Sequence, residues 1–148
     1  MKTRILLVDD DPALRKLLKD ALPESIVLID IAETGREGLD MIVKRKPDLI
    51  LLDWNLPDLN GFEVIREVEL SFRGLFVFAT AYNKYAVEAF ETSAVDYLLK
   101  PFSEERFDKA IKKAIHHFEV FKLANSQRAI DKLLATYQEL ISREGSKS

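Results

Sequence analysis

The sequence lacks cysteine altogether, and it also lacks long apolar runs. Without cysteine the chain forms neither disulfides nor thiolate metal sites, which suits a reducing compartment. No segment approaches the roughly 18–20 apolar residues of a membrane span, and no apolar stretch before Asp9 resembles a signal peptide. We therefore expect a cytoplasmic protein that makes no membrane contact.

An excess of either charge is also missing. The chain carries 22 Lys and Arg against 25 Asp and Glu, a net charge of −3. Nucleic-acid-binding domains usually show a basic surplus, so we expect no direct nucleic-acid binding by this chain. Its 148 residues, 47% of them hydrophobic, can bury the core of one domain with a short appendage.

Five short apolar runs alternate with amphipathic segments of helical period. The runs predict strands at residues 4–8, 26–31, 49–52, 75–79 and 95–99. Strands separated by helices of this length form right-handed βαβ units and a parallel sheet with helices on both faces. The predicted class is therefore α/β and doubly wound.

Capping residues mark where the helices begin. Asp11 precedes Pro12 at a first helical position, and 34–37 reads Thr-Gly-Arg-Glu, a capping box. Asn83 and Ser103 are the expected caps of the last two helices of the unit. The helix that follows the capping box is expected to turn one apolar face inward, formed by Leu39, Ile42 and Val43.

The C-terminal segment is expected to form a helix of its own. We expect the preceding helix to end before about residue 123, with Asn125 or Ser126 capping the next one, and a frayed tail from Gly145. The chain thus divides into a domain at 3–120 and an amphipathic helix with a tail at 121–148. Its apolar stripe leaves three roles open: packing on its own domain, pairing with a second helix, or linking to a further domain. The stripe comprises Ile130, Leu133, Leu134, Tyr137, Leu140 and Ile141.

Charged residues follow three of the predicted strands. Asp9 and Asp10 follow the first, Asp53 the third and Lys100 the fifth. Because the C-terminal ends of parallel strands meet at one edge of a sheet, these groups are expected to converge there. Carboxylates at close range raise a pKa or recruit a cation, and oxygen-only ligands suit Mg²⁺ best. The backbone carbonyl of Asn55 would add a neutral oxygen.

A carboxylate beside such a cation can act as a nucleophile toward phosphorus. Phosphoryl transfer needs in-line placement and neutralisation of charge, to which Lys100 would contribute. Thr80, at the end of the fourth strand, offers a hydroxyl donor. Taken singly, each residue is an ordinary turn or cap residue. Their joint occurrence at strand ends predicts a metal-and-phosphoryl site.

These same segments resemble a two-component response-regulator receiver domain over residues 3 to about 118. The resemblance is carried by Asp9-Asp10, by 53–61 (Asp-Trp-Asn-Leu-Pro-Asp-Leu-Asn-Gly), by Thr80-Ala81 and by 97–102 (Tyr-Leu-Leu-Lys-Pro-Phe). It implies a flavodoxin-like five-stranded sheet of order 2-1-3-4-5, here with a C-terminal helical extension. Residues 81–90 and 96–102 are similar to receivers of the LytTR type. Those usually precede a DNA-binding domain, so the chain either stands alone or belongs to a longer protein.

The resemblance implies a role for each residue of the site. Asp53 would accept a phosphoryl group from the phosphohistidine of a histidine kinase or phosphotransfer protein. Thr80 and Lys100 would bind the phosphoryl oxygens, and Lys100 and Pro101 would be joined by a cis peptide. The implied Mg²⁺ ligands are Asp10 (principal), Asp9, Asp53 and the carbonyl of Asn55.

The resemblance also implies a switch. Thr80 would move toward the phosphoryl oxygens, and Tyr97 would turn into the space that it leaves. The face formed by the fourth helix, fifth strand and fifth helix would then repack to control a partner or a homodimer. Here that face would include Lys84, Glu88, Glu91, Tyr97, Glu105 and Arg106.

Two other classes of function compete with this one. A Mg²⁺-dependent phosphatase of the haloacid-dehalogenase type wants a second Asp two residues after its nucleophile, where this chain has Asn55. A receiver fold kept only as an unphosphorylated interaction domain is the other. We therefore expect no enzyme beyond self-catalysed phosphoryl acceptance and autodephosphorylation.

Overall fold

The computed structural model describes residues 2–25, 27–68, 74–81 and 94–146. Within these residues, five parallel strands form one sheet in the order β2-β1-β3-β4-β5. The predicted strands and their order are confirmed, and each observed end lies within one residue of its prediction. The strands are β1 (Thr3–Val8), β2 (Val27–Ala32), β3 (Leu49–Asp53), β4 (Leu75–Thr80) and β5 (Asp96–Leu99).

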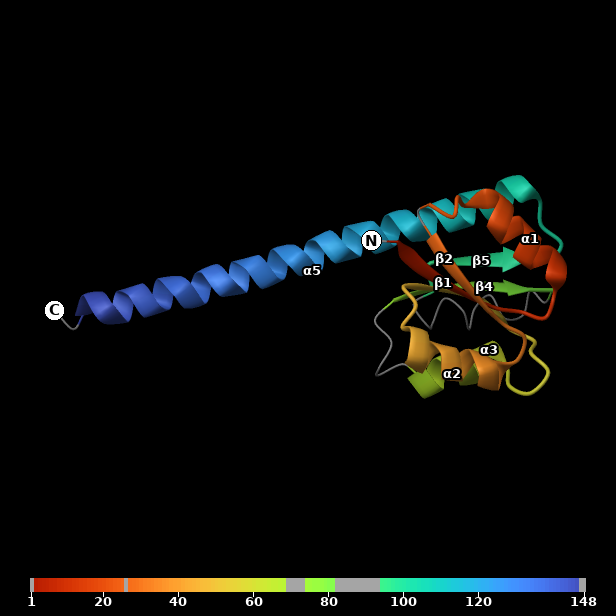
Figure 1. Cartoon of the computed structure of the whole chain (residues 1–148), viewed down its shortest axis with the longest axis horizontal. Coiled ribbons are helices and arrows are strands. Elements are labelled where there is room, and N and C mark those ends of the chain that lie inside the picture. The colour runs from red at the N-terminus through yellow and green to blue at the C-terminus, as the bar shows by residue number, and fades with distance from the viewer. Residues whose placement is uncertain (1, 26, 69–73, 82–93, 147–148) are drawn as a thin grey trace.

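Helices cover both faces of the sheet (Figure 1). Helices α1 (Pro12–Ala21) and α5 (Glu104–Ser146) lie on one face, and α2 (Gly35–Arg45) and α3 (Gly61–Val68) lie on the other. The central strand β3 is buried along its whole length, with alternate side chains entering two separate cores. A strand covered on both faces reads as a continuous apolar run, as 49–52 does.

Three of the predicted helix caps, at Asp11, Thr34 and Ser103, are confirmed. The Asp11 side chain accepts from the Ala13 N–H at 3.0 Å, and the Ser103 hydroxyl accepts from the Arg106 N–H at 3.0 Å. The Thr34 hydroxyl accepts from the Glu37 N–H at 3.1 Å. In return, the Glu37 carboxylate accepts at 3.2 Å from the N–H of Glu33, one residue before the cap.

The apolar face predicted for α2 is partly wrong. Ile42 is buried and Leu39 is half-buried, but 66% of Val43 is exposed. The buried face instead includes Gly38, against which the methyl groups of Val8 pack so closely that an added Cβ would lie 3.0 Å from them. A glycine contributes no hydrophobic side chain to the sequence pattern, so the pattern missed Gly38 and included Val43 in the buried face instead.

The break predicted near residue 123 is also wrong. Helix α5 runs without interruption from Glu104 to Ser146 and projects far beyond the sheet (Figure 1). Asn125 and Ser126 favour caps, but alone they do not stop a helix, and no proline or glycine occurs between Glu104 and Arg143. Gly145, expected in a frayed tail, lies in the last turn.

The projecting part of α5 does not pack on its own domain. Every residue from Glu119 to Arg143 is exposed, which contradicts the first role considered for this segment, packing on its own domain.

Among the described residues, no helix combines the length and the apolar character that a membrane span requires. The helix expected from Asn83, with Lys84, Glu88 and Glu91 of the predicted signalling face, lies outside the described residues.

Candidate metal and phosphoryl-transfer site

The predicted site residues lie together at one edge of the sheet. Asp53 is the last residue of β3 and Thr80 the last of β4, whereas Asp9 follows β1 and Lys100 follows β5. Because the strands are parallel, all these positions fall at the same edge. Residues as far apart in the sequence as Asp9 and Lys100 thereby come into direct contact.

Three carboxylates form the centre of this site. One oxygen from each of Asp9, Asp10 and Asp53 lies within 4.8 Å of the other two. Asp9 is fully buried and Asp53 is 7% exposed, while Asp10 is exposed. The cluster is therefore open to solvent on the side of Asp10 and closed beneath.

Lys100 is the cationic partner of this cluster. Its Nζ lies 2.8 Å from Asp9 Oδ2 and 3.6 Å from Asp53 Oδ2. The backbone holds it in place, since the Lys100 N–H donates to the Thr80 carbonyl at 2.7 Å. The peptide bond between Lys100 and Pro101 is cis, as the sequence resemblance implied.

Burial and mutual repulsion perturb the titration of the site. Desolvation, followed by the charge of Asp9, raises the pKa of Asp53 to about 6, although Lys100 and the Asn55 N–H oppose the shift. Desolvation also raises the pKa of Asp9 against the hydrogen bond from Lys100. For Lys100, desolvation lowers the pKa, but the hydrogen bond to Asp9 and the charge of Asp53 outweigh it and raise the pKa.

The donor set fits a hard divalent cation. Three carboxylates against one ammonium leave a formal charge of −2 in a partly desolvated cluster. Burial, followed by the charge of Asp9, raises the pKa of Asp53 there. A divalent cation offsets two negative charges, and carboxylate oxygens with water on the open side are what Mg²⁺ prefers. Asp9, Asp10 and Asp53 are the side chains that would hold it.

The loop between β3 and α3 fixes the orientation of Asp53. The Asn55 N–H donates to Asp53 Oδ1 at 3.1 Å, and the Gly61 N–H closes the loop by donating to the Trp54 carbonyl at 2.8 Å. Gly61 permits this approach, because an added Cβ would lie 3.1 Å from the Asp53 carbonyl. The buried Trp54 ring packs on Phe78, with 5.1 Å between ring centroids.

Asp58 is a positioning residue that the sequence reasoning missed. Its carboxylate accepts from the N–H groups of Gly35 at 2.8 Å and Arg36 at 3.0 Å, so it joins the loop after β3 to the start of α2. Although desolvation acts the other way, these hydrogen bonds lower the pKa of Asp58. Its partners lie 22 and 23 residues away in the sequence, beyond the range of any local pattern.

The predicted switch residues occupy neighbouring strands. Thr80 is fully buried, and Tyr97 is half-buried against the core beneath α2 and α3. Arg106 of α5 clamps β5 beside them: its guanidinium donates to both oxygens of Asp96, at 2.8 and 3.1 Å, and to the Tyr97 carbonyl at 3.0 Å. Tyr97 therefore lies on a strand that is tied directly to α5.

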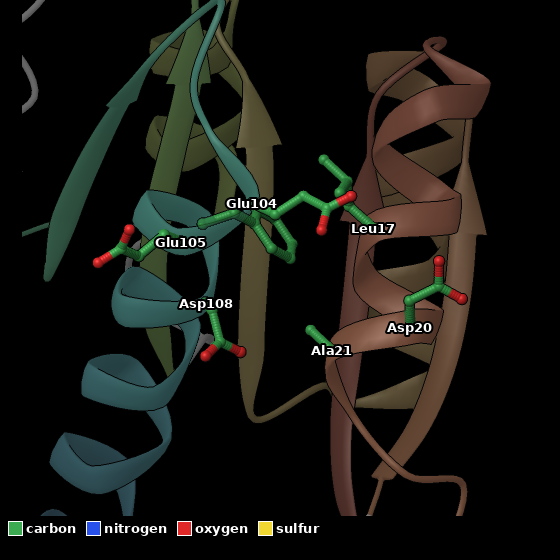
Figure 2. Close-up of a pocket in the computed structure, with 7 residues that line it drawn as sticks. Leu17, Asp20, Ala21, Glu104, Glu105 and Asp108 are labelled. Atoms are coloured by element: carbon green, nitrogen blue, oxygen red, sulfur yellow. The ribbon is translucent and has the colours of Figure 1, made fainter.

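A separate hollow lies between α1 and the start of α5 (Figure 2). Four acidic side chains and three apolar ones line it, and none of them belongs to the predicted site. The lining residues are Leu17, Asp20, Ala21, Glu104, Glu105, Phe107 and Asp108.

Known proteins with similar sequences are response regulators. The response regulator receiver domain family matches residues 5–112. The sensory transduction protein LytT of Oceanobacillus iheyensis is 35% identical over 144 residues, 94% of this chain and 58% of that protein. The transcriptional regulatory protein BtsR of Escherichia coli is 36% identical over 110 residues, 73% of this chain and 46% of that protein. The chain thus spans about half the length of these relatives.

Solved structures give the same answer. A CheY-like response regulator receiver domain protein from Methanospirillum hungatei superposes with a TM-score of 0.70 at 30% identity, covering 80% of this chain and 98% of that one. The response regulatory domain of protein mrkE from Klebsiella pneumoniae gives a TM-score of 0.69 at 28% identity, covering 79% and 98%. Because the family match spans most of the chain and these structures share its fold, the chain belongs to the receiver-domain family of two-component response regulators.

Proposed function

We propose that this receiver accepts a phosphoryl group on Asp53 from a histidine kinase or phosphotransfer protein in the cytoplasm. The observation that carries the proposal is the placement of the Asp53 carboxylate. It is oriented by the Asn55 N–H, clusters with the carboxylates of Asp9 and Asp10, and lies 3.6 Å from the Lys100 ammonium. In the transfer, an Asp53 oxygen bonds to phosphorus while the bond from phosphorus to the donor imidazole nitrogen breaks. Hydrolysis of the acyl phosphate returns the carboxylate.

The neighbouring residues would support this transfer. Mg²⁺, held by Asp9, Asp10, Asp53 and the Asn55 carbonyl, would neutralise charge on the phosphoryl oxygens. Lys100 would exchange part of its contact with Asp9 for a phosphoryl oxygen, since its Nζ already lies within 3.6 Å of Asp53. Thr80, buried at the end of β4, would donate its hydroxyl to another.

A phosphatase remains the less favoured function. At the position where such an enzyme would carry its acid/base, Asn55 is exposed and uses its backbone N–H to orient Asp53. An amide cannot donate and recover a proton, so the residue present supports one slow hydrolysis of the acyl phosphate and not multiple turnover.

Mass spectrometry tests the phosphoacceptor directly. After incubation with acetyl phosphate and Mg²⁺, the wild-type chain is expected to gain a labile adduct of about 80 Da, one phosphoryl group. Asp53→Asn is expected to gain none. Asp20→Asn, an exposed carboxylate on α1, is the matched control and should be labelled like wild type. A folded wild-type chain that gains no adduct from acetyl phosphate or from a kinase would contradict the proposal.

We further propose that Thr80 and Tyr97 convert the phosphate into a change at β5. Tyr97 is half-buried and β5 is clamped to α5 by Arg106, so movement of the ring would be felt by both elements. Tyr97→Ala is expected to keep the adduct on Asp53 but to abolish the phosphorylation-dependent change in amide exchange at residues 96–99. Equal changes in wild type and variant would remove Tyr97 from the switch.

A further inference from the structure

The projecting half of α5 carries a continuous apolar stripe that nothing in its own domain covers. Seven large side chains along it are 51–73% exposed. They are the six side chains of the predicted stripe (Ile130, Leu133, Leu134, Tyr137, Leu140 and Ile141) and Leu123, which extends it toward the receiver. Isolated exposed apolar residues are common on protein surfaces, but a contiguous set of this size marks an interaction surface.

The receiver to which this helix is attached cannot cover the stripe. The side chains that α5 buries against the sheet include Phe107, Ile111 and Phe118. At 3.6 residues per turn, the stripe points about 120° away from that buried face. Because the helix is continuous, bringing the stripe onto the sheet would require breaking or overwinding it. The occupant must therefore come from elsewhere.

The charge pattern suits a second copy of the same stripe. From Leu123 to Ile141, all four charged residues lie on the opposite side of the helix, so two stripes can meet without opposing like charges. The charged residues on that opposite side are Arg128, Asp131, Lys132 and Glu139. Two of them make contacts within their own helix: Asp131 accepts from Gln127, and Glu139 pairs with Arg143.

The dimensions also suit a pair of helices. The segment from Leu123 to Ile141 spans roughly 28 Å at 1.5 Å per residue. Its seven side chains offer on the order of 700 Å² per copy, because a large side chain carries roughly 150–200 Å² and more than half of each is exposed. Stable interfaces bury about 800 Å² per partner, so the stripe approaches the required area once its flanking residues are added.

An apolar hollow lies at the centre of the stripe. Ala129, Ile130, Leu133, Leu134 and Tyr137 line a shallow apolar hollow on the helix surface. A small residue beside large ones creates the kind of hole that a knob from a facing helix fills. We propose that α5 associates with the same stripe of a second copy of this chain, independently of the receiver face.

Sedimentation equilibrium of the full chain tests this association. Wild type is expected to show a concentration-dependent mass that rises to that of two chains. Leu133→Lys places a charge at the centre of the stripe and is expected to weaken association at least about tenfold. The matched control is Ala135→Lys, an exposed position on the opposite side of the same turns, which should associate like wild type.

Each outcome decides the proposal. Both substitutions should leave the receiver intact, and fluorescence of the single, buried Trp54 checks this. A wild-type chain that stays monomeric at high concentration overturns the proposal and leaves the stripe to a different partner. Equal association of wild type and Leu133→Lys also overturns it, because the contact would then lie elsewhere on the molecule.

Discussion

At the residue scale, the site holds negative charge in a place where charge is costly. Asp9 and Asp53 are buried, and the pKa of Asp53 is raised to about 6 despite a nearby ammonium. Three carboxylates this close repel one another and destabilise the fold. The same arrangement suits the binding of a cation and the presentation of a nucleophile, so the destabilisation should be measurable in the free energy of unfolding of the metal-free protein.

The substitution Asp53→Asn is expected to stabilise the metal-free fold at neutral pH. The folded-state pKa of about 6 exceeds the ordinary value of 3.8, so the folded protein binds more protons than the unfolded chain between those values. The free energy of unfolding of the wild-type protein therefore falls as the pH rises from about 4 to 6, because the folded protein must release the proton on Asp53. Urea unfolding followed by Trp54 fluorescence should show the variant more stable by up to about 3 kcal/mol at pH 7.5.

The difference between the two proteins should vanish near pH 4, where Asp53 is protonated in the folded state. Asp20→Asn, at an exposed position, should follow wild type at every pH. A gain from Asp53→Asn that stays constant down to pH 4 would show that charge is not its origin.

Asp10→Asn is expected to weaken Mg²⁺ binding. Asp10 is the exposed member of the carboxylate cluster, so its removal disturbs packing least while deleting a ligand. Quenching of Trp54, the residue after Asp53, offers a titration signal. We expect affinity to fall by about tenfold or more, since Mg²⁺ relies on one or two carboxylates. An unchanged dissociation constant, with Asp11→Asn as the control, would place the cation elsewhere.

At the scale of elements, local signals explain which predictions were confirmed. Apolar runs, caps and strand-end charges are local features of the sequence, so the five strands and the convergence of Asp9, Asp53 and Lys100 could be predicted from them. The strand order was predicted from the resemblance to receiver domains. What could not be predicted depends on distant contacts. The anchoring of Asp58 on α2 and the packing of Gly38 on Val8 leave little or no local pattern. The continuity of α5 was missed for a different reason, because Asn125 and Ser126 favour caps but do not stop a helix by themselves.

Helix α2 ends in a conformation that its sequence does not favour. Lys46 caps the helix with φ of 49° and ψ of 63°, and its N–H donates to the Ile42 carbonyl. A side chain in this left-handed region costs about 1 kcal/mol relative to glycine. Lys46→Gly is therefore expected to stabilise the protein by about 0.5–1 kcal/mol in urea unfolding.

A substitution within the helix provides the control for this cap. Lys44→Gly lies two residues earlier, where glycine costs about 1 kcal/mol, and it should destabilise the protein. If Lys46→Gly also destabilises, the cap geometry does not determine the end of α2.

At the scale of the whole molecule, α5 has a first part that packs in the receiver core and a second part that is exposed. Its first part supplies Phe107, Ala110, Ile111 and Ala114 to the core, whereas every residue from Glu119 to Arg143 is exposed. The domain boundary predicted at residue 120 thus falls inside a continuous helix. Arg106, at the receiver end, contacts β5. One continuous helix therefore connects the proposed switch to the apolar stripe.

Removing the projecting half of α5 is expected to leave the receiver intact. A chain ending at Lys122 loses residues 123–143, all of which are exposed, together with the last five residues of the chain. Its free energy of unfolding should therefore match that of the dilute full chain within about 0.5 kcal/mol. Phe118→Ala, one turn earlier and buried, should cost about 3 kcal/mol. Urea unfolding followed by Trp54 fluorescence measures both, because Trp54 lies in the receiver core.

The dependence of stability on protein concentration then distinguishes association through the exposed part of α5 from the intrinsic stability of the receiver. If the stripe binds a second copy, the full chain should become more stable as its concentration rises, whereas the chain ending at Lys122 should not. The same comparison with Leu133→Lys should remove the concentration dependence without any truncation. Loss of receiver stability in the short chain, even when dilute, would instead mean that the exposed half of α5 supports the fold that precedes it.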